Sequence, residues 1–491
     1  MLRDRAPAAL RDALQQAETY PDWLEAAREV DRATGAAAWR DEDASPHYHH
    51  ELIREQLDRM TRLREDGDTE ALIALLHRGL NRNLGDLRSP ALYRPALTGT
   101  KRLIERYLAE TERTLEHLCD AALPGYPDAV KLALFQAAAR VYGRSALMLS
   151  GGATLGFYHL GVVKALWSQG LLPTVISGAS TGAMVAGGIC ARTEDENRTL
   201  FANPEAMRLD GLALAGPRRI LQDRAALRPE QLAEVLEHNI GPYSFGEAHA
   251  RSGRVLNVSV SPTRVRQRPR ILNHLTAPDV LVVSAVVASS ALPGLYPPSR
   301  LYARGPDGAA VPYIPSERWV DGSMAGDLPK ARLGRLFNAN HFIVSQTNPH
   351  VLPFLERRPN QPPLLRAIVA LTLSAGVAWG LDVARHLVGE RAARAWLDHA
   401  HSLATQTYRG DINITPAFPP DLLVRIVKNP TPHELARFIR HGERAVWPRL
   451  AMIRDQTRIG RCFERCVGRL EARLGYPTKS PGQTWGAPES S

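Results

Sequence analysis

Apolar residues in roughly the first 140 positions of the chain recur with helical spacing. In ELIREQLDRMTRLRE, apolar side chains repeat every three or four residues, which places them on one face of a helix: Leu52, Ile53, Leu57, Met60 and Leu63. The stretches TEALIALLHRGL and GTKRLIERYLAETERTLEHL have the same period. Glycine and proline residues separate these segments and mark turns. The pattern predicts an all-α N-terminal domain over residues 1–143.

The pattern changes near residue 144, where short apolar runs begin to alternate with turns and helical stretches. An apolar run ends at Leu149, a helical pattern covers Tyr158 to Ser168, and a second apolar run ends at Gly178. Further strands are expected in RVLNVSVSPT, in the short run before Asp321 and in HFIVSQTNPH. Strands that alternate with helices indicate an α/β fold with a mainly parallel sheet, here over residues 144–350.

The remainder of the chain is predicted to be a helical extension with one strand, residues 351–476. The uncharged stretch Ala367–Leu381 favours a core helix. A helix in contact with a membrane is an alternative, because Trp379 and nearby arginines suit an interface. DINITPAF predicts the strand, and the arginine-rich amphipathic stretch Pro432–Leu474 would favour contact with anionic lipid. Residues 477–491 are rich in Pro, Gly and Ser and predict a disordered tail.

Composition places few restrictions on function. The chain has 491 residues, 44% of them hydrophobic and 23% charged, which is typical of a globular protein. Its net charge of +10 is spread without a long basic block, so no nucleic-acid partner is expected. The first residues contain no apolar signal-peptide core, and Ala367–Leu381 is shorter than the ~20 residues that a spanning helix needs. We therefore expect a cytoplasmic protein that is soluble or bound peripherally to a membrane or lipid inclusion.

Two sets of metal-binding residue types have simpler interpretations. Cys462 and Cys466 are one helical turn apart, but no further ligands follow at zinc spacing, so free thiols in a reducing compartment are preferred. Three histidines follow Pro46 closely, which favours a loop over a metal site: His47, His49 and His50. No metal or organic cofactor is expected.

Two glycine-rich turns carry the candidate chemistry. In GASTG, Ser180 lies between Gly178 and Gly182 at a strand-to-helix junction, as in a nucleophile elbow, where glycines leave room for a strained backbone. In SGGATLG, Gly151 and Gly152 precede a helix, so backbone N–H groups can converge on an oxyanion. A dinucleotide-binding turn is disfavoured, because Ala153 occupies the second glycine position of that fingerprint.

A serine nucleophile needs a base, and the residues leave two routes open. A triad would use a histidine late in the chain: His350, His386 or His433. A dyad would use Asp321, which ends a short apolar strand and is followed at once by Gly322. Parallel sheets place their sites at the carboxyl ends of strands, which suits Asp321.

SGGATLGFYHLGVVKAL, GASTG and DGS, in this order, resemble the patatin-like phospholipase family. The resemblance implies a three-layer α/β/α core and a Ser-Asp dyad, with Ser180 as nucleophile and Asp321 as base. It further implies an oxyanion loop at Gly151, Gly152 and Ala153. The remaining motif positions are Gly156, Gly178, Gly182 and Gly322.

The N-terminal region resembles the helical domain that precedes the patatin core in plant and fungal lipid-droplet triacylglycerol lipases. This implies hydrolysis of triacylglycerol or phospholipid esters. Lysophospholipid acyltransfer and a non-catalytic lipid-binding scaffold are alternatives.

Three positions depart from the family pattern. Ala153 replaces a common third glycine, which restricts the backbone but keeps its N–H group. Leu155 replaces a basic residue, so any help from that charge is lost. Ser323 follows the Asp-Gly pair, where a smaller residue is common, and should change little.

Overall fold

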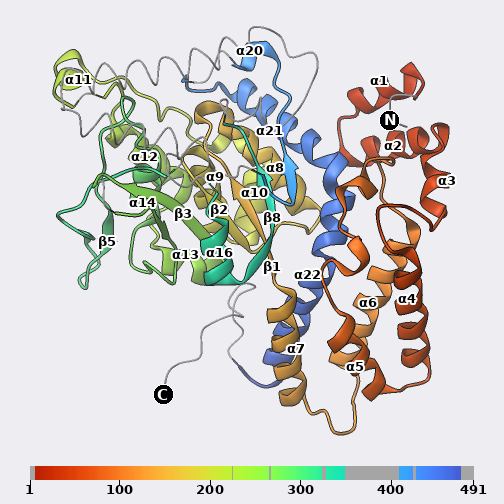
Figure 1. Cartoon of the computed structure of the whole chain (residues 1–491). Coiled ribbons are helices and arrows are strands. Elements are labelled where there is room, and N and C mark those ends of the chain that lie inside the picture. The colour runs from red at the N-terminus through yellow and green to blue at the C-terminus, as the bar shows by residue number, and fades with distance from the viewer. Residues whose placement is uncertain are drawn as a thin grey trace.

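The computed structural model describes residues 6–223, 225–264, 267–322, 328–348, 409–423 and 427–476. A helical N-terminal region lies beside an α/β core, and the last helix runs along both (Figure 1). The expectations for the stretch Ala367–Leu381 and for the tail 477–491 fall outside the described residues.

The N-terminal region is helical throughout its described residues, as predicted. Its longest helices pair closely: α4 packs on α6, and α5 packs on α4. The α-helices are α1 (Ala8–Gln16), α2 (Tyr20–Ala33), α3 (Ala36–Asp41), α4 (His50–Glu65), α5 (Thr69–Gly79), α6 (Arg102–Asp120) and α7 (Asp128–Tyr142); two 3-10 turns are η2 (Leu84–Asp86) and η3 (Pro90–Tyr93).

A seven-stranded, mainly parallel sheet forms the core. Its order is β4-β3-β2-β1-β8-β9, with β7 paired to β3; β4 and β7 run antiparallel and the others parallel. The strands are β1 (Arg144–Leu149), β2 (Val175–Gly178), β3 (Val255–Pro262), β4 (Arg270–Leu272), β7 (Trp319–Asp321), β8 (Ala339–Ser345) and β9 (Ile412–Ile414). A separate hairpin consists of β5 (Tyr302–Arg304) and β6 (Ala310–Pro312). Each predicted strand is present.

Helices cover both faces of this sheet. On β1, Met148 packs with Leu333 and Phe337 of α16, whereas Leu147 and Leu149 belong to the large core on the other face. This alternation gives the three-layer α/β/α arrangement that the resemblance implies. The helices of this region are α8 (Tyr158–Ser168), α9 (Thr181–Cys190), α10 (Glu194–Ala202), α11 (Pro217–Asp223), α12 (Pro229–Ile240), α13 (Phe245–Ser252), α14 (Val282–Ser289) and α16 (Lys330–Phe337), with 3-10 turns η4 (Ala153–Phe157) and η5 (Pro204–Ala206).

The C-terminal segment is integrated with the core. Strand β9 pairs with β8, and α21 (Pro432–Val446) crosses α8 so closely that a Cβ atom on Gly161 would lie against the carbonyl oxygen of Ile439. After α20 (Pro420–Leu423) and α21, a 3-10 turn η6 (Trp447–Arg449) leads into α22 (Leu450–Arg473), which packs on α6 and α7. The domain boundaries at 143 and 350 stay predictions.

Arginine side chains of α22 are used within the protein. Arg458 and Arg465 both pair with Glu112 of α6, and Arg465 also pairs with Glu116 at 3.0 Å. Arg469 and Arg473 pair with Asp120 at the end of the same helix. The arginines on this face of α22 therefore lie against the acidic residues of α6. None of the helices in the described part of the chain combines the length and the hydropathy that a membrane span requires.

Candidate active site

The turn after β2 holds Ser180 in a strained backbone conformation. Ser180 has φ 52° and ψ −126°, a region that side-chain-bearing residues rarely adopt, and α9 begins at the next residue. A Cβ atom on Gly178 would lie 2.3 Å from the carbonyl oxygen of Gly182. A Cβ atom on Gly182 would lie 2.3 Å from the carbonyl oxygen of Leu149. The glycines of GASTG are therefore required by close backbone contacts.

The loop after β1 lies directly against this turn. Thr181 donates a 2.7 Å hydrogen bond from its hydroxyl to the carbonyl oxygen of Ala153, and a Cβ atom on Gly156 would lie 2.6 Å from the Thr181 Cβ. Ala153 has φ 47°, so it occupies the left-handed region that favours glycine. The structure thus brings the loop Gly151–Ala153 to the residue that follows Ser180.

Strand register brings Asp321 to the same edge of the sheet. On β3, Val258 pairs with Gly178 of β2 on one side and with Leu272 of β4 on the other. Two residues further on, Val260 pairs with Arg270 of β4 and with Asp321. Because β4 occupies one side of β3, Asp321 must lie on the side of β2, two residues beyond Gly178. This is where the chain of β2 continues to Ser180.

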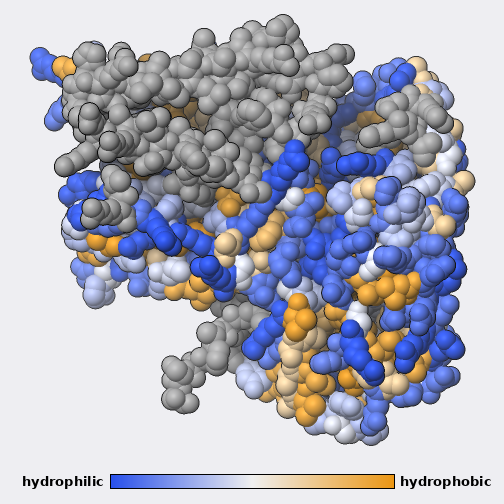
Figure 2. Space-filling model, viewed as in Figure 1, coloured by the Kyte–Doolittle hydropathy of each residue, from blue (hydrophilic) through white to orange (hydrophobic). Residues whose placement is uncertain are grey.

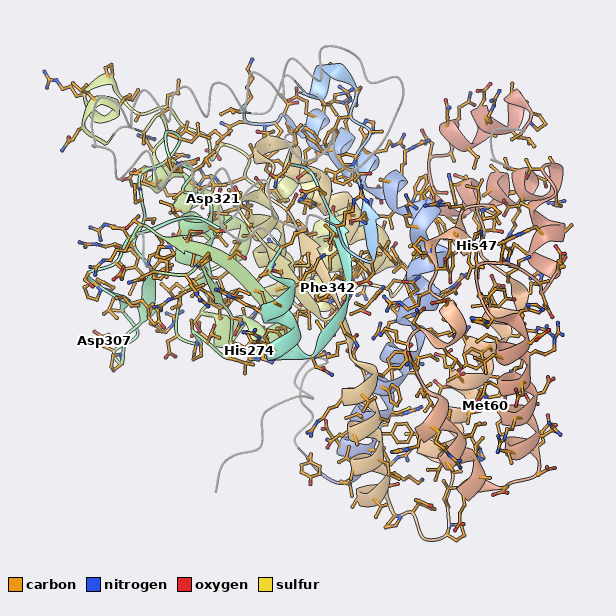
Figure 3. All side chains as sticks on the ribbon, in the orientation of Figure 1. His47, Met60, His274, Asp307, Asp321 and Phe342 are labelled. Atoms are coloured by element: carbon orange, nitrogen blue, oxygen red, sulfur yellow. The ribbon has the colours of Figure 1, made fainter. Side chains whose placement is uncertain are left out.

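Asp321 is buried, with 2% of its surface exposed, and lies at the upper end of the sheet in Figure 3. Its backbone N–H donates to the carbonyl oxygen of Ala291 at 3.1 Å. The adjacent Gly322 packs tightly on β3, since a Cβ atom there would lie 2.0 Å from the carbonyl oxygen of Ser259. Asp321 is therefore fixed in position by the backbone on both sides.

Ser289, at the end of α14, joins these parts and was missed by sequence reasoning. Its hydroxyl accepts the backbone N–H of Ser180 at 3.0 Å and donates to the carbonyl oxygen of Ser259 at 2.7 Å. Ser289 is fully buried. The sequence signal was weak, because Ser289 is a small polar residue within a run of small residues, Ala285–Ala291.

A buried histidine, His159, holds residues at the base of the loop Gly151–Ala153, and sequence reasoning missed it as well. His159, on α8, contacts Ser345 Oγ at 2.7 Å, the carbonyl oxygen of Ser150 at 3.0 Å and Thr347 Oγ1 at 3.2 Å. Thr347 in turn donates to the carbonyl oxygen of Gly151 at 3.0 Å. Burial lowers the pKa of His159 to about 4, so the ring is neutral near pH 7.

A Cβ atom on Gly152 would lie 2.3 Å from Thr347 Oγ1, so glycine is required there as well. The ends of β1 and β8, together with His159, thus define the path of the loop.

The alternative base and metal residues lie apart from this arrangement or outside the described residues. His433 is exposed in the first turn of α21, and His350 and His386 fall outside the described residues. Among the described residues, one group has metal-ligand geometry, Glu112, Glu116 and Cys462, but both carboxylates already pair with arginines. His47 lies in the N-terminal region, remote from Asp321 (Figure 3).

All four cysteines are buried free thiols, and the sulfur atoms of Cys462 and Cys466 are 3.9 Å apart.

Two family models match parts of this chain. A family model described as patatin-like phospholipase matches residues 147–330, which contain both glycine-rich turns and Asp321. This chain belongs to the patatin-like phospholipase family. A second model, a domain of unknown function designated DUF3336, matches residues 2–140, the helical N-terminal region. The resemblance inferred from the motifs is confirmed.

Curated members of the family from fungi and plants align with most of this chain. Triacylglycerol lipase ptl3 of Schizosaccharomyces pombe is 33% identical over 462 residues, covering 91% of this chain and 94% of that protein. Triacylglycerol lipase 4 of Saccharomyces cerevisiae is 33% identical, covering 94% of this chain and 53% of that protein. Triacylglycerol lipase SDP1L of Arabidopsis thaliana is 32% identical, covering 93% and 58%. The chain thus spans about half the length of the last two relatives.

The structure explains one departure from the family pattern. Leu155, where many members carry a basic residue, is fully buried and packs with Leu422 of α20 and Phe438 of α21. An apolar side chain suits this cluster, and a charged one there would be costly to desolvate. Ser323 lies outside the described residues.

Proposed function

We propose that this protein is a serine hydrolase of lipid acyl esters that works through a dyad of Ser180 and Asp321. The observation that carries the proposal is the strained turn at Ser180, φ 52° and ψ −126°, with Asp321 in line with the same strand end. Strained backbones of this kind persist where the surrounding structure enforces them, and they cluster at active sites. Gly151, Gly152 and Ala153 supply the candidate oxyanion loop, and no metal or cofactor takes part.

In the first half of the reaction, Ser180 Oγ attacks the ester carbonyl carbon while its proton passes to the Asp321 carboxylate. Backbone N–H groups of Gly152 and Ala153 stabilise the negative oxygen of the tetrahedral intermediate. The intermediate collapses, the C–O bond to the alcohol breaks, and the proton on Asp321 goes to the departing alkoxide. The products are the free alcohol and an acyl ester on Ser180.

In the second half, water attacks the acyl carbon and gives its proton to Asp321. The second tetrahedral intermediate releases a fatty acid and returns the proton to Ser180. A carboxylate has an ordinary pKa near 3.9 and is a weak base in water, so the buried setting of Asp321 is an essential part of this proposal.

The substrate class follows from the relatives. Because three relatives that align with most of this chain are named triacylglycerol lipases, we take acylglycerols in a lipid droplet or emulsion as substrate. Phospholipids are the second choice. Such substrates lie at a lipid surface, so the proposal includes peripheral contact with a membrane or lipid inclusion in the cytoplasm.

The deciding experiment compares purified wild type with Ser180→Ala on a triacylglycerol emulsion, with circular dichroism to establish that both are folded. We expect the variant to lose essentially all fatty-acid release and all labelling by a fluorophosphonate probe. A folded Ser180→Ala protein with wild-type activity would refute the nucleophile. Transfer of acyl groups to an added lysophospholipid instead of water would indicate an acyltransferase, and lipid binding without any turnover would indicate a scaffold.

A further inference from the structure

A short segment near the candidate site exposes large aliphatic side chains. Leu214 is 78% exposed, and in the helix α11 that follows it Leu221 is 84% and Ile220 39% exposed. Helix α11 lies at the upper left corner of the molecule in Figure 1, where Figure 2 shows hydrophobic beside hydrophilic residues. Single exposed leucines are ordinary, but several within one protruding segment indicate an interaction surface.

This segment, residues 213–228, is called the α11 finger here, and its base is firmly held. The Ala215 N–H donates to the Ala226 carbonyl at 2.8 Å, and the Arg228 N–H to the Ala213 carbonyl at 3.0 Å. The base is also hydrogen-bonded to the core, because the Leu227 N–H donates to the Leu295 carbonyl at 2.8 Å and the Leu227 side chain is buried. The exposed leucines are thus presented on a fixed support.

Hydrogen bonds connect the residue before the α11 finger to the residue after the candidate oxyanion loop. Just before the finger, the Leu212 N–H donates to Asn429 Oδ1 at 2.8 Å, and Asn429 Nδ2 donates back to the Leu212 carbonyl at 3.0 Å. The carbonyl of the preceding Lys428 accepts the hydroxyl of Thr154 at 2.8 Å. Val427, next in this segment, is 48% exposed. The chain that carries the finger is therefore linked by hydrogen bonds to the edge of the candidate site.

The charge of the finger indicates its partner. Residues 213–228 contain four arginines and one aspartate, and Lys428, which precedes Asn429, is exposed. Aliphatic side chains among basic residues fit an anionic phospholipid surface. Its apolar layer accepts the aliphatic side chains, and its negative headgroups attract the basic residues. Four arginines of α22 are already paired with Glu112, Glu116 or Asp120, so they are less suited to this role: Arg458, Arg465, Arg469 and Arg473.

We propose that the α11 finger is the lipid-docking element of this protein and inserts Leu214 and Leu221 into an anionic phospholipid surface next to the active site. The inference rests on the proposed function, because docking is useful to a lipid hydrolase: it brings the candidate site to the surface where acyl esters lie. It is tested by binding, which does not depend on turnover.

The test uses the full chain with the double substitution Leu214→Glu and Leu221→Glu. Co-sedimentation is measured with phosphatidylcholine vesicles that do or do not contain phosphatidylglycerol. The matched control is Val141→Glu, because Val141 is 81% exposed on α7, at the lower end of the molecule in Figure 1. Hydrolysis of a water-soluble short-chain ester reports whether the site is intact.

We expect the double variant to bind anionic vesicles at least about tenfold more weakly, with unchanged hydrolysis of the soluble ester and slower hydrolysis of the emulsion. Val141→Glu should match wild type in all three measurements. Arg218→Gln should weaken binding to anionic vesicles more than to neutral ones.

Wild-type binding by the double variant would overturn the inference. So would equal loss in Val141→Glu, or a wild-type dimer that the double variant turns into a monomer, since the finger would then be an interface between copies of the chain. If wild type binds vesicles through the finger but hydrolyses neither ester, the proposed function fails while the docking element stands.

Discussion

The hydroxyl of Ser289 accepts a 3.0 Å hydrogen bond from the backbone N–H of Ser180 and donates a 2.7 Å hydrogen bond to the carbonyl of Ser259. One buried hydroxyl thus holds the strained turn against strand β3, the strand that also pairs with Asp321. The bridge adds to the strand pairing that holds the two proposed dyad residues together, which come from segments about 140 residues apart.

Ser289→Ala should therefore reduce activity more than it reduces substrate binding. It leaves the part-buried N–H of Ser180 and the Ser259 carbonyl without their partner, which costs on the order of 1–3 kcal/mol of folding stability. We expect kcat to fall about tenfold or more, with KM nearly unchanged, because the turn moves while the acyl-binding surface does not.

Ser290→Ala is the matched control. Ser290 is also buried, but its hydroxyl donates to the carbonyl of Val286 in the helix that ends just before it, so this variant should keep a wild-type kcat. Equal effects of the two substitutions on kcat would show that Ser289 has no specific positioning role.

Substitution of Gly182 by alanine should be severe. The added Cβ atom would lie 2.3 Å from the Leu149 carbonyl oxygen and 2.6 Å from that of Ser150, and neither backbone group can move without shifting the loop. We expect a loss of about 3 kcal/mol or more in the free energy of unfolding, measured by urea denaturation, and at least about 10²-fold in rate.

The control for that variant is Gly188→Ala in the same helix, α9. There the nearest atom to a new Cβ is Arg192 Nη1 at 3.2 Å, the end of a flexible side chain. Alanine is the better helix former, so stability should be unchanged or higher by up to about 1 kcal/mol. Similar losses in both variants would mean that α9 tolerates no added methyl group, whatever its contacts.

Much of the fold could be predicted because its signals are local. Helical periodicity identified the N-terminal region, and apolar runs identified the strands. The glycines around Ser180 could be recognised because close backbone contacts at Gly178 and Gly182 leave no other choice. The local pattern made Asp321 one of two kinds of candidate base, with a late histidine as the other, and the family resemblance favoured Asp321.

Other features depend on contacts that sequence does not display. Ser289 and His159 act through side-chain hydrogen bonds to distant backbone groups, and nothing in their neighbourhoods marks them. Strand β9 joins the sheet beside β8 although more than sixty residues separate them. The exposure of the α11 finger was equally invisible, because a short irregular segment has no periodicity from which a buried face could be predicted.

Ala153→Gly should have little effect, although it restores a glycine common in the family. Ala153 has φ 47°, and glycine removes a strain of about 1 kcal/mol. Glycine also gains about 0.5–1 kcal/mol of conformational entropy in the unfolded chain, so the two effects nearly cancel. Urea denaturation should give a free energy of unfolding within about 1 kcal/mol of wild type.

Activity should also change little in Ala153→Gly, because the backbone N–H is retained. A large gain in rate would mean instead that the alanine holds the loop away from its productive position.

The buried His159 predicts a loss of stability in acid. Its pKa is lowered to about 4 by burial, against 6.5 in the unfolded chain, and its ring nitrogens contact Ser345, Thr347 and the Ser150 carbonyl, all uncharged. Because the unfolded chain binds the proton more tightly, stability is complete above pH 6.5 and falls as the pH drops from 6.5 to 4. The loss from this one group is on the order of 3 kcal/mol.

Urea denaturation at pH 7 and pH 4.5 would measure this loss. His341 and His274 also have lowered pKa values, so the effect of His159 must be isolated as the difference between wild type and His159→Gln. The variant should be less stable at pH 7, since its neutral side chain replaces the hydrogen bonds of the ring imperfectly, yet it should lose less stability on acidification. An equal loss of stability in both proteins would show that protonation of His159 does not contribute to the destabilisation in acid.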